Sequence, residues 1–217
     1  MAGIIYWCLD LVRLLVMPPR EQAYALGLIK RMRSGRHHLG SCGYWRSNIE
    51  GRSIDADGRP LPWMNYAMIE FWRERLRIDQ HVFEFGSGGS SIFYSSQCAS
   101  VTCVEHDPVF ADYVRKLLPS NGLLIEAPDT EEAYVGALAG TGRRYDVIVV
   151  DGLHRMACAR AALAALEPRG VVVVDDTEAD IFKPSIGFFE SAGFRALHFV
   201  GLKPQSHAAA RTSVFYR

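Results

Sequence analysis

The stretch HVFEFGSGGSS, residues 81–91, decides the fold that we expect for this sequence. A short run of strand-forming residues ends at Phe85, and Gly86, Gly88 and Gly89 follow it closely. Glycines let the backbone turn sharply and let a ligand approach the main chain, while the N-terminus of a following helix offers unpaired N–H groups. The stretch therefore predicts a strand, a ligand-binding turn and a helix in succession.

Short apolar runs alternate with helical stretches from here to the C-terminus. The expected strands lie at 81–85, 100–105, 122–126, 145–151, 170–175, 194–202 and 212–216. The expected helices lie at 90–97, 108–118, 130–139, 155–166 and 179–192. Runs that are apolar throughout, such as 147–150, are typical of parallel strands covered on both faces. We therefore expect an α/β fold, a doubly wound Rossmann-like sheet of about seven strands. The sheet should be mostly parallel, with an antiparallel C-terminal strand, because the last connection is too short for a parallel crossover.

Residues 1–60 differ from this pattern and are expected to form a cap or attachment segment ahead of a domain at 61–217. Residues 4–17 are almost continuously apolar, but a helix of that length spans only about 21 Å of a hydrocarbon core about 30 Å thick. Residues 34–60 are rich in Gly, Ser, Asp and Arg and predict a long irregular connection, followed by a helix from Pro62.

The N-terminal segment is also basic, although the net charge of the chain is zero. Its densest cluster comprises Lys30, Arg31, Arg33 and Arg36. A local basic segment beside an acidic domain predicts peripheral contact with an anionic membrane surface through residues 4–36. A homodimer contact, packing of the helix on its own domain and a solvated charged turn are the alternatives.

Composition excludes several classes of protein. The chain has 217 residues, 49% hydrophobic and 22% charged, which is ordinary globular usage and excludes a disordered or fibrous chain. The neutral overall charge argues against a nucleic-acid partner. Five cysteines without a C-x-x-C pair argue against a zinc site or a complete disulfide framework, so we expect a cytoplasmic protein.

An acidic residue ends the second expected strand. Glu105 stands 19 residues after Gly86, where its carboxylate can accept hydrogen bonds from both hydroxyls of a ribose. A glycine-rich turn followed by such an acid serves two classes of cofactor, the dinucleotides and S-adenosylmethionine. These two features alone leave both open.

The segments VFEFGSG (82–88) and VEHD (104–107) resemble the class I S-adenosylmethionine-dependent methyltransferases, in which an acidic residue stands two places before the first glycine. YDVIVVDG (145–152) and GVVVVDD (170–176) resemble the fourth and fifth strands of that family. The resemblance covers about residues 60–217 and implies S-adenosylmethionine as the cofactor. It assigns the methionine end of the cofactor to Glu84, Gly86, Ser87, Gly88, Ser90 and Ser91, the ribose to Glu105, and the adenine to His106 and Asp129. The alternatives are a purely structural carboxylate for Glu84 and a helix N-cap for Asp129.

Three carboxylates follow the fourth and fifth strands. Asp151, Asp175 and Asp176 should converge at one edge of the sheet and would repel each other unless a cation or a proton compensates. Mg²⁺ takes such oxygen ligands, and at these positions the chain resembles the metal-dependent O-methyltransferases of the catechol and macrolide-sugar kinds. The resemblance implies Mg²⁺ bound by these three residues. The alternative is that Asp176 caps a helix in solvent and no metal binds.

His154, three residues after Asp151, is the candidate general base, and the two residues form the expected catalytic set. The catechol pattern has Lys at this position, and the macrolide-sugar pattern has an Asp where this chain has Leu153. An exposed histidine in the first turn of a helix is the alternative.

These features together predict a methyltransferase that transfers the methyl group of S-adenosylmethionine to a hydroxyl of a small molecule, sugar or glycan. The aromatic residues expected to cover the acceptor are Tyr44, Trp45, Trp63 and Tyr66, and core packing is the alternative for Trp63. A nicotinamide-dependent dehydrogenase is the second candidate, disfavoured because Ser91 replaces the third glycine of the dinucleotide motif. A non-catalytic interaction module with the same fold is the third.

Overall fold

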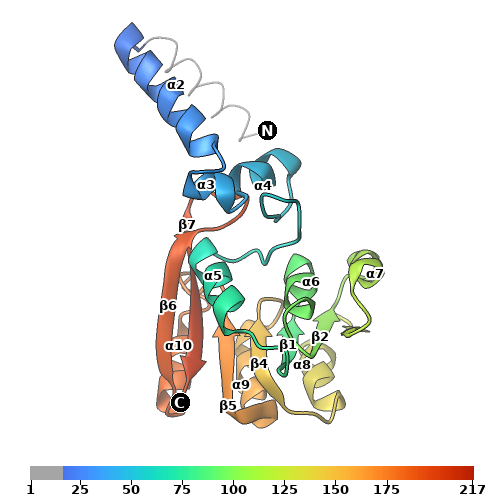
Figure 1. Cartoon of the computed structure of the whole chain (residues 1–217). Coiled ribbons are helices and arrows are strands. Elements are labelled where there is room, and N and C mark those ends of the chain that lie inside the picture. The colour runs from blue at the N-terminus through green and yellow to red at the C-terminus, as the bar shows by residue number, and fades with distance from the viewer. Residues whose placement is uncertain (1–16) are drawn as a thin grey trace.

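The computed structural model describes residues 17–217, and a single sheet runs through them. Its strands are β1 (His81–Phe85), β2 (Ser100–Glu105), β3 (Gly122–Glu126), β4 (Tyr145–Val150), β5 (Leu166–Val174), β6 (Arg195–Leu202) and β7 (Ala209–Tyr216). They lie in the order β3-β2-β1-β4-β5-β7-β6 (Figure 1). β7 is antiparallel to β5 and β6, and the other pairs are parallel. The predicted fold class is confirmed.

Helices cover both faces of the sheet because successive side chains of each strand point to opposite faces. On one face, α8 (Glu131–Gly140), α9 (Arg155–Ala165) and α10 (Pro184–Ser191) pack on residues such as Phe83 and Ile148. On the other face, α5 (Tyr66–Arg75) and α6 (Gly89–Ser95) pack on residues such as Val82 and Val149. α7 (Pro108–Leu117) covers the outer strands β2 and β3.

The order in which the chain adds parallel strands to the sheet reverses between β1 and β4. From β1 the chain proceeds outward to β2 and β3, and it then returns to place β4 on the other side of β1. In open α/β sheets ligands bind at such a switch point, outside the carboxyl ends of the strands. The loops after β1, β2, β4 and β5 therefore frame the expected site.

The prediction of a long irregular connection over residues 34–60 is wrong in part. Two short helices, α3 (His38–Ser41) and α4 (Tyr44–Glu50), form there, and Gly43 and Gly51 at the two ends of α4 adopt left-handed φ angles of 88° and 66°. Gly43 separates α3 from α4, and Gly51 ends α4. Neither position carries the steric cost that a Cβ would have at a left-handed φ. The helix expected from Pro62 begins instead at Tyr66, because the Asn65 side chain caps it by accepting a hydrogen bond from the Met68 N–H.

The aromatic residues expected over the acceptor separate into two groups. Tyr44, in α4, and Tyr66, in α5, are buried in the core on the face of the sheet that α5 covers, so their predicted place at the acceptor is wrong. Trp45 packs against the same core and donates from Nε1 to the Met32 carbonyl at 2.8 Å. Trp63 is about half exposed and remains available to a ligand.

The first described helix, α2 (Pro19–Arg33), extends away from the rest of the molecule (Figure 1). None of its residues is buried. The expected helix over residues 4–17 lies outside the described residues except for its last position. Between residues 17 and 217, none of the helices combines the length and the apolar character that crossing a bilayer would require.

Candidate active site

The turn after β1 brings the chain against the loop after β4. Gly86 and Gly88 have φ angles of 111° and 150°, which side chains rarely tolerate. A Cβ on Gly86 would lie 3.3 Å from the backbone nitrogen of Gly152, and a Cβ on Gly152 would lie 2.1 Å from the Tyr134 hydroxyl. Only glycine fits at Gly152, and this close approach keeps the two loops together at the sheet edge.

Glu84 lies beneath this turn and is almost fully buried. The hydroxyls of Ser90 and Ser91 each donate to one of its carboxylate oxygens at 2.5 Å. Burial raises the pKa of Glu84 to about 7, although the two hydroxyls oppose the shift. Glu84 therefore fixes the start of α6, and it also lines the cavity above the turn.

Glu105 organises the end of β2. Its Oε1 accepts hydrogen bonds from the backbone N–H groups of His106 and Asp107 at 2.9 and 3.1 Å, and its Oε2 accepts one from the Ser87 hydroxyl at 2.8 Å. The carboxylate joins the turn after β1 to the turn after β2. Because each oxygen has two lone pairs, Oε2 keeps capacity for a ligand hydroxyl.

A cavity of about 500 Å³ opens above these two turns. It is lined by Glu84, Gly86, Ser87, Glu105, His106, Asp107, Phe110, Tyr134, Asp151, Gly152, Leu153 and Arg155. The structure thus brings most of the predicted cofactor residues to one cavity. We call it the β2 cavity.

A second cavity, of about 560 Å³, adjoins the first. Trp63, Leu61 and Pro60 form one wall, and α7 contributes Tyr113 and other apolar side chains to another. We call it the Trp63 cavity. Four residues line both cavities, namely Ser87, Phe110, Asp151 and Arg155.

The three predicted metal ligands lie together. One carboxylate oxygen from each of Asp151, Asp175 and Asp176 lies within 4.8 Å of the others. Asp175 is buried, accepts a hydrogen bond from the Thr212 hydroxyl, and has one oxygen without a partner. Burial raises the pKa of Asp175 well above its usual range. Burial also raises the pKa of Asp151 to about 7, although Arg155 opposes the shift.

Two cationic side chains, neither predicted as part of the site, compensate these carboxylates. Arg155 donates to Asp151 at 3.1 Å and to Asp176 at 3.2 Å. Lys203, in the loop between β6 and β7, donates to the other oxygen of Asp176 at 2.8 Å. Burial would raise the pKa of Asp176, but these contacts outweigh it and lower the pKa.

His154 and Asp129 lie together outside this cluster. His154 adopts a left-handed φ of 50°, and its Nε2 donates to the Asp129 backbone carbonyl at 2.6 Å. Its ring contacts Tyr134 edge-on, and His154 is not among the lining residues of either cavity. These contacts place the imidazole beside α8 and not in the lining of either cavity.

Comparison with known proteins agrees with this geometry. Residues 83–177 match a family model described as a methyltransferase domain. This part of the chain is a methyltransferase domain. The match confirms the resemblance to class I S-adenosylmethionine-dependent methyltransferases and the expectation of an enzyme, and it leaves the dehydrogenase and the non-catalytic module without support. No curated protein matches the sequence.

Solved structures share the fold of the methyltransferase domain at low sequence identity. A precorrin-6y C5,15-methyltransferase from Geobacter metallireducens is 18% identical, with a TM-score of 0.58 over 78% of this chain and 97% of that chain. A proposed caffeoyl-CoA O-methyltransferase from Staphylococcus aureus is 12% identical, with a TM-score of 0.58 over 90% and 98%. A methyltransferase-like protein from Streptococcus mutans, SMU.1697c, in complex with SAH, is 12% identical, with a TM-score of 0.50 over 68% and 94%.

Proposed function

We propose that the β2 cavity holds S-adenosylmethionine. Its residues suit that molecule, since Glu105 offers a carboxylate oxygen to the ribose hydroxyls and the Gly86 turn admits a close ligand. Glu84 and Asp151 give the cavity an acidic lining, which suits a positively charged sulfonium. When bound, the cofactor supplies an electrophilic methyl group. The adenine contacts with His106 and Asp129 stay predictions.

We propose that the acceptor enters the Trp63 cavity and presents a hydroxyl at the residues shared by the two cavities. That junction is the observation on which the proposed function rests. Methyl transfer needs donor and acceptor held in line, so positioning by Ser87, Phe110 and Arg155 should supply most of the rate enhancement. The half-exposed Trp63 offers an aromatic face to a sugar or another flat acceptor.

Asp151 is the proposed general base at this junction. A base with a pKa near the working pH is the most effective, and burial raises the pKa of Asp151 to about 7. Arg155 contacts Asp151 Oδ1, which fixes the direction of the carboxylate. His154 stays a prediction as a second base, although its hydrogen bond to the Asp129 carbonyl does not favour it.

The Mg²⁺ ion implied by the resemblance does not fit the residues as they are arranged. Both oxygens of Asp176 already face a cation, and one oxygen of Asp151 does too. We therefore assign no step of the reaction to a metal.

A direct test is to incubate the purified protein with a cell extract and S-adenosylmethionine carrying a CD₃ group. Mass spectrometry should find a product heavier by one labelled methyl group, and fragmentation should place the label on oxygen. The matched control is the Asp151→Asn variant, which should form far less product. Label on carbon or nitrogen would contradict the proposed acceptor, and no labelled product in extracts that contain candidate hydroxyl acceptors would contradict the proposed function.

We also propose that residues 4–36 attach the enzyme to an anionic membrane surface. The last turn of α2 carries Lys30, Arg31 and Arg33, and all three are exposed. Apolar side chains of the same helix, among them Leu28 and Ile29, are exposed as well. Exposed apolar and basic side chains on one helix favour an interfacial position at anionic lipid. A homodimer through this segment is the competing outcome.

A further inference from the structure

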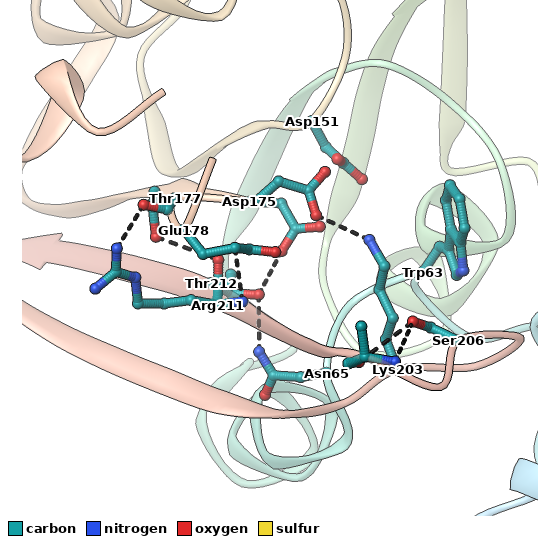
Figure 2. A network of polar contacts seen from close by, with 12 residues as sticks. Trp63, Asn65, Asp151, Asp175, Thr177, Glu178, Lys203, Ser206, Arg211 and Thr212 are labelled. Atoms are coloured by element: carbon teal, nitrogen blue, oxygen red, sulfur yellow. Dashed lines mark hydrogen bonds and ion pairs between the residues drawn. The ribbon is translucent and has the colours of Figure 1, made fainter. Parts of the chain in front are cut away.

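Lys203 is held from two sides at the acidic cluster, which comprises Asp151, Asp175 and Asp176. Its Nζ lies 2.8 Å from Asp176 Oδ1 and 4.4 Å from the centre of the Trp63 ring. Trp63 in turn donates from Nε1 to the carbonyl of Pro204, the residue after Lys203, at 2.7 Å. The lysine side chain is only 12% exposed. Figure 2 shows its ammonium group pointing from the β6–β7 loop toward the carboxylates.

Arg155, the first residue of α9, contacts the same carboxylates. Its guanidinium contacts Asp151 and Asp176, donates to the Asp175 backbone carbonyl at 2.7 Å, and stacks 4.4 Å from the centre of the Phe182 ring. It is also only 12% exposed. Both cations are therefore fixed by packing as well as by charge.

The two cations contact three of the six carboxylate oxygens that a divalent ion could use, both oxygens of Asp176 and Oδ1 of Asp151. A metal at the centre of the three carboxylates would sit close to two immobile positive charges with little water between them, and such repulsion is strong where screening is weak. The carboxylate oxygens without a cationic partner are the two of Asp175 and Oδ2 of Asp151, and an ion bound to them would still lie beside both cations. Three carboxylates and two cations leave little charge for a metal to neutralise.

We propose that Lys203 and Arg155 take the charge-compensating place of a divalent metal, so that this site works without one. Lys203 is a positioning residue in this arrangement. Through Asp176 it holds the acidic cluster, and through Trp63 it holds one wall of the acceptor cavity. The proposal concerns the acceptor site of the proposed function, but it predicts a property of the protein without substrate, so the two can fail separately.

The test measures binding of Mn²⁺, a paramagnetic substitute for Mg²⁺, by electron paramagnetic resonance on the full chain. The wild-type protein should show no site that depends on Asp176. The Lys203→Met variant keeps the apolar stem against Trp63 but removes the charge, and it should bind Mn²⁺ at least about tenfold more tightly than the wild type. Lys203→Arg should restore the wild-type behaviour.

Lys183 supplies a matched control, since it pairs with Asp180 at 2.6 Å on the exposed surface. Lys183→Met should leave Mn²⁺ binding unchanged. Tight binding of Mn²⁺ to the wild type that is lost in Asp176→Asn would overturn the proposal. So would a folded Lys203→Met variant whose Mn²⁺ affinity equals that of the wild type. If that variant does not fold, the wild-type measurement alone decides.

Discussion

Replacing Glu105 by alanine should weaken binding of S-adenosylmethionine more than any other single change in the β2 cavity. The carboxylate is the proposed acceptor for the ribose hydroxyls, and it also holds the N–H groups of His106 and Asp107 and the hydroxyl of Ser87. A hydrogen bond to a charged group contributes about 1.5–3 kcal/mol. At about 1.4 kcal/mol per tenfold, loss of one such bond raises Kd about 10- to 140-fold.

Isothermal titration calorimetry measures this effect, with thermal denaturation to confirm that the variant is folded. Glu126 gives the control, because it is paired in register with Glu105 on the neighbouring strand but lies about half exposed beside Arg115. Glu126→Ala should leave the affinity within about twofold, as expected for a surface substitution away from the site. Equal affinity of folded Glu105→Ala and wild type would refute the role of Glu105.

Three further predictions concern the base, the loop contact and the N-terminal helix. Asp151→Asn should lower turnover by about 10² to 10⁴ with little change in cofactor affinity. Wild-type turnover should rise with pH through about 7 as Asp151 loses its proton, and the variant should lack this rise in stopped-assay pH profiles. Gly152→Ala, whose Cβ overlaps Tyr134, should lower the free energy of unfolding in urea by about 1–3 kcal/mol, whereas Gly136→Ala, which has open space, should not. Reversing the three charges in the last turn of α2 should reduce sedimentation with phosphatidylglycerol vesicles but not with phosphatidylcholine vesicles; equal sedimentation, or a changed oligomeric state in light scattering, would contradict the membrane contact.

The sheet could be predicted from sequence because each strand is an apolar run bounded by turn residues. The starts of β5 and β7 are the exceptions. β7 begins at Ala209 rather than at residue 212. For β5, Pro168 and Gly170 indicate a break, and the predicted strand begins at residue 170. In the structure β5 begins at Leu166, which pairs with Tyr145 across an irregularity in the β4–β5 register. Tertiary pairing here overrides the local signal.

The candidate site was predictable only where its residues directly follow strands. Asp151 and Asp175 do so, Glu105 is the last residue of β2, and the sheet order brings all three to one edge. Lys203 lies in a loop 27 residues beyond its partner Asp176, and no local pattern encodes the path by which that loop returns. Arg155 carried a usable signal, because an arginine four residues after Asp151 at the start of a helix can reach back to that carboxylate.

A crystal structure of the protein with S-adenosylhomocysteine would test the central claim, that the two cavities divide cofactor from acceptor. We predict the ribose hydroxyls on Glu105 and the sulfur beside Asp151, facing the Trp63 cavity. The methionine moiety should lie against the turn at Gly86. A nucleoside bound in the Trp63 cavity, or a sulfur directed away from Asp151, would contradict the proposed site of methyl transfer.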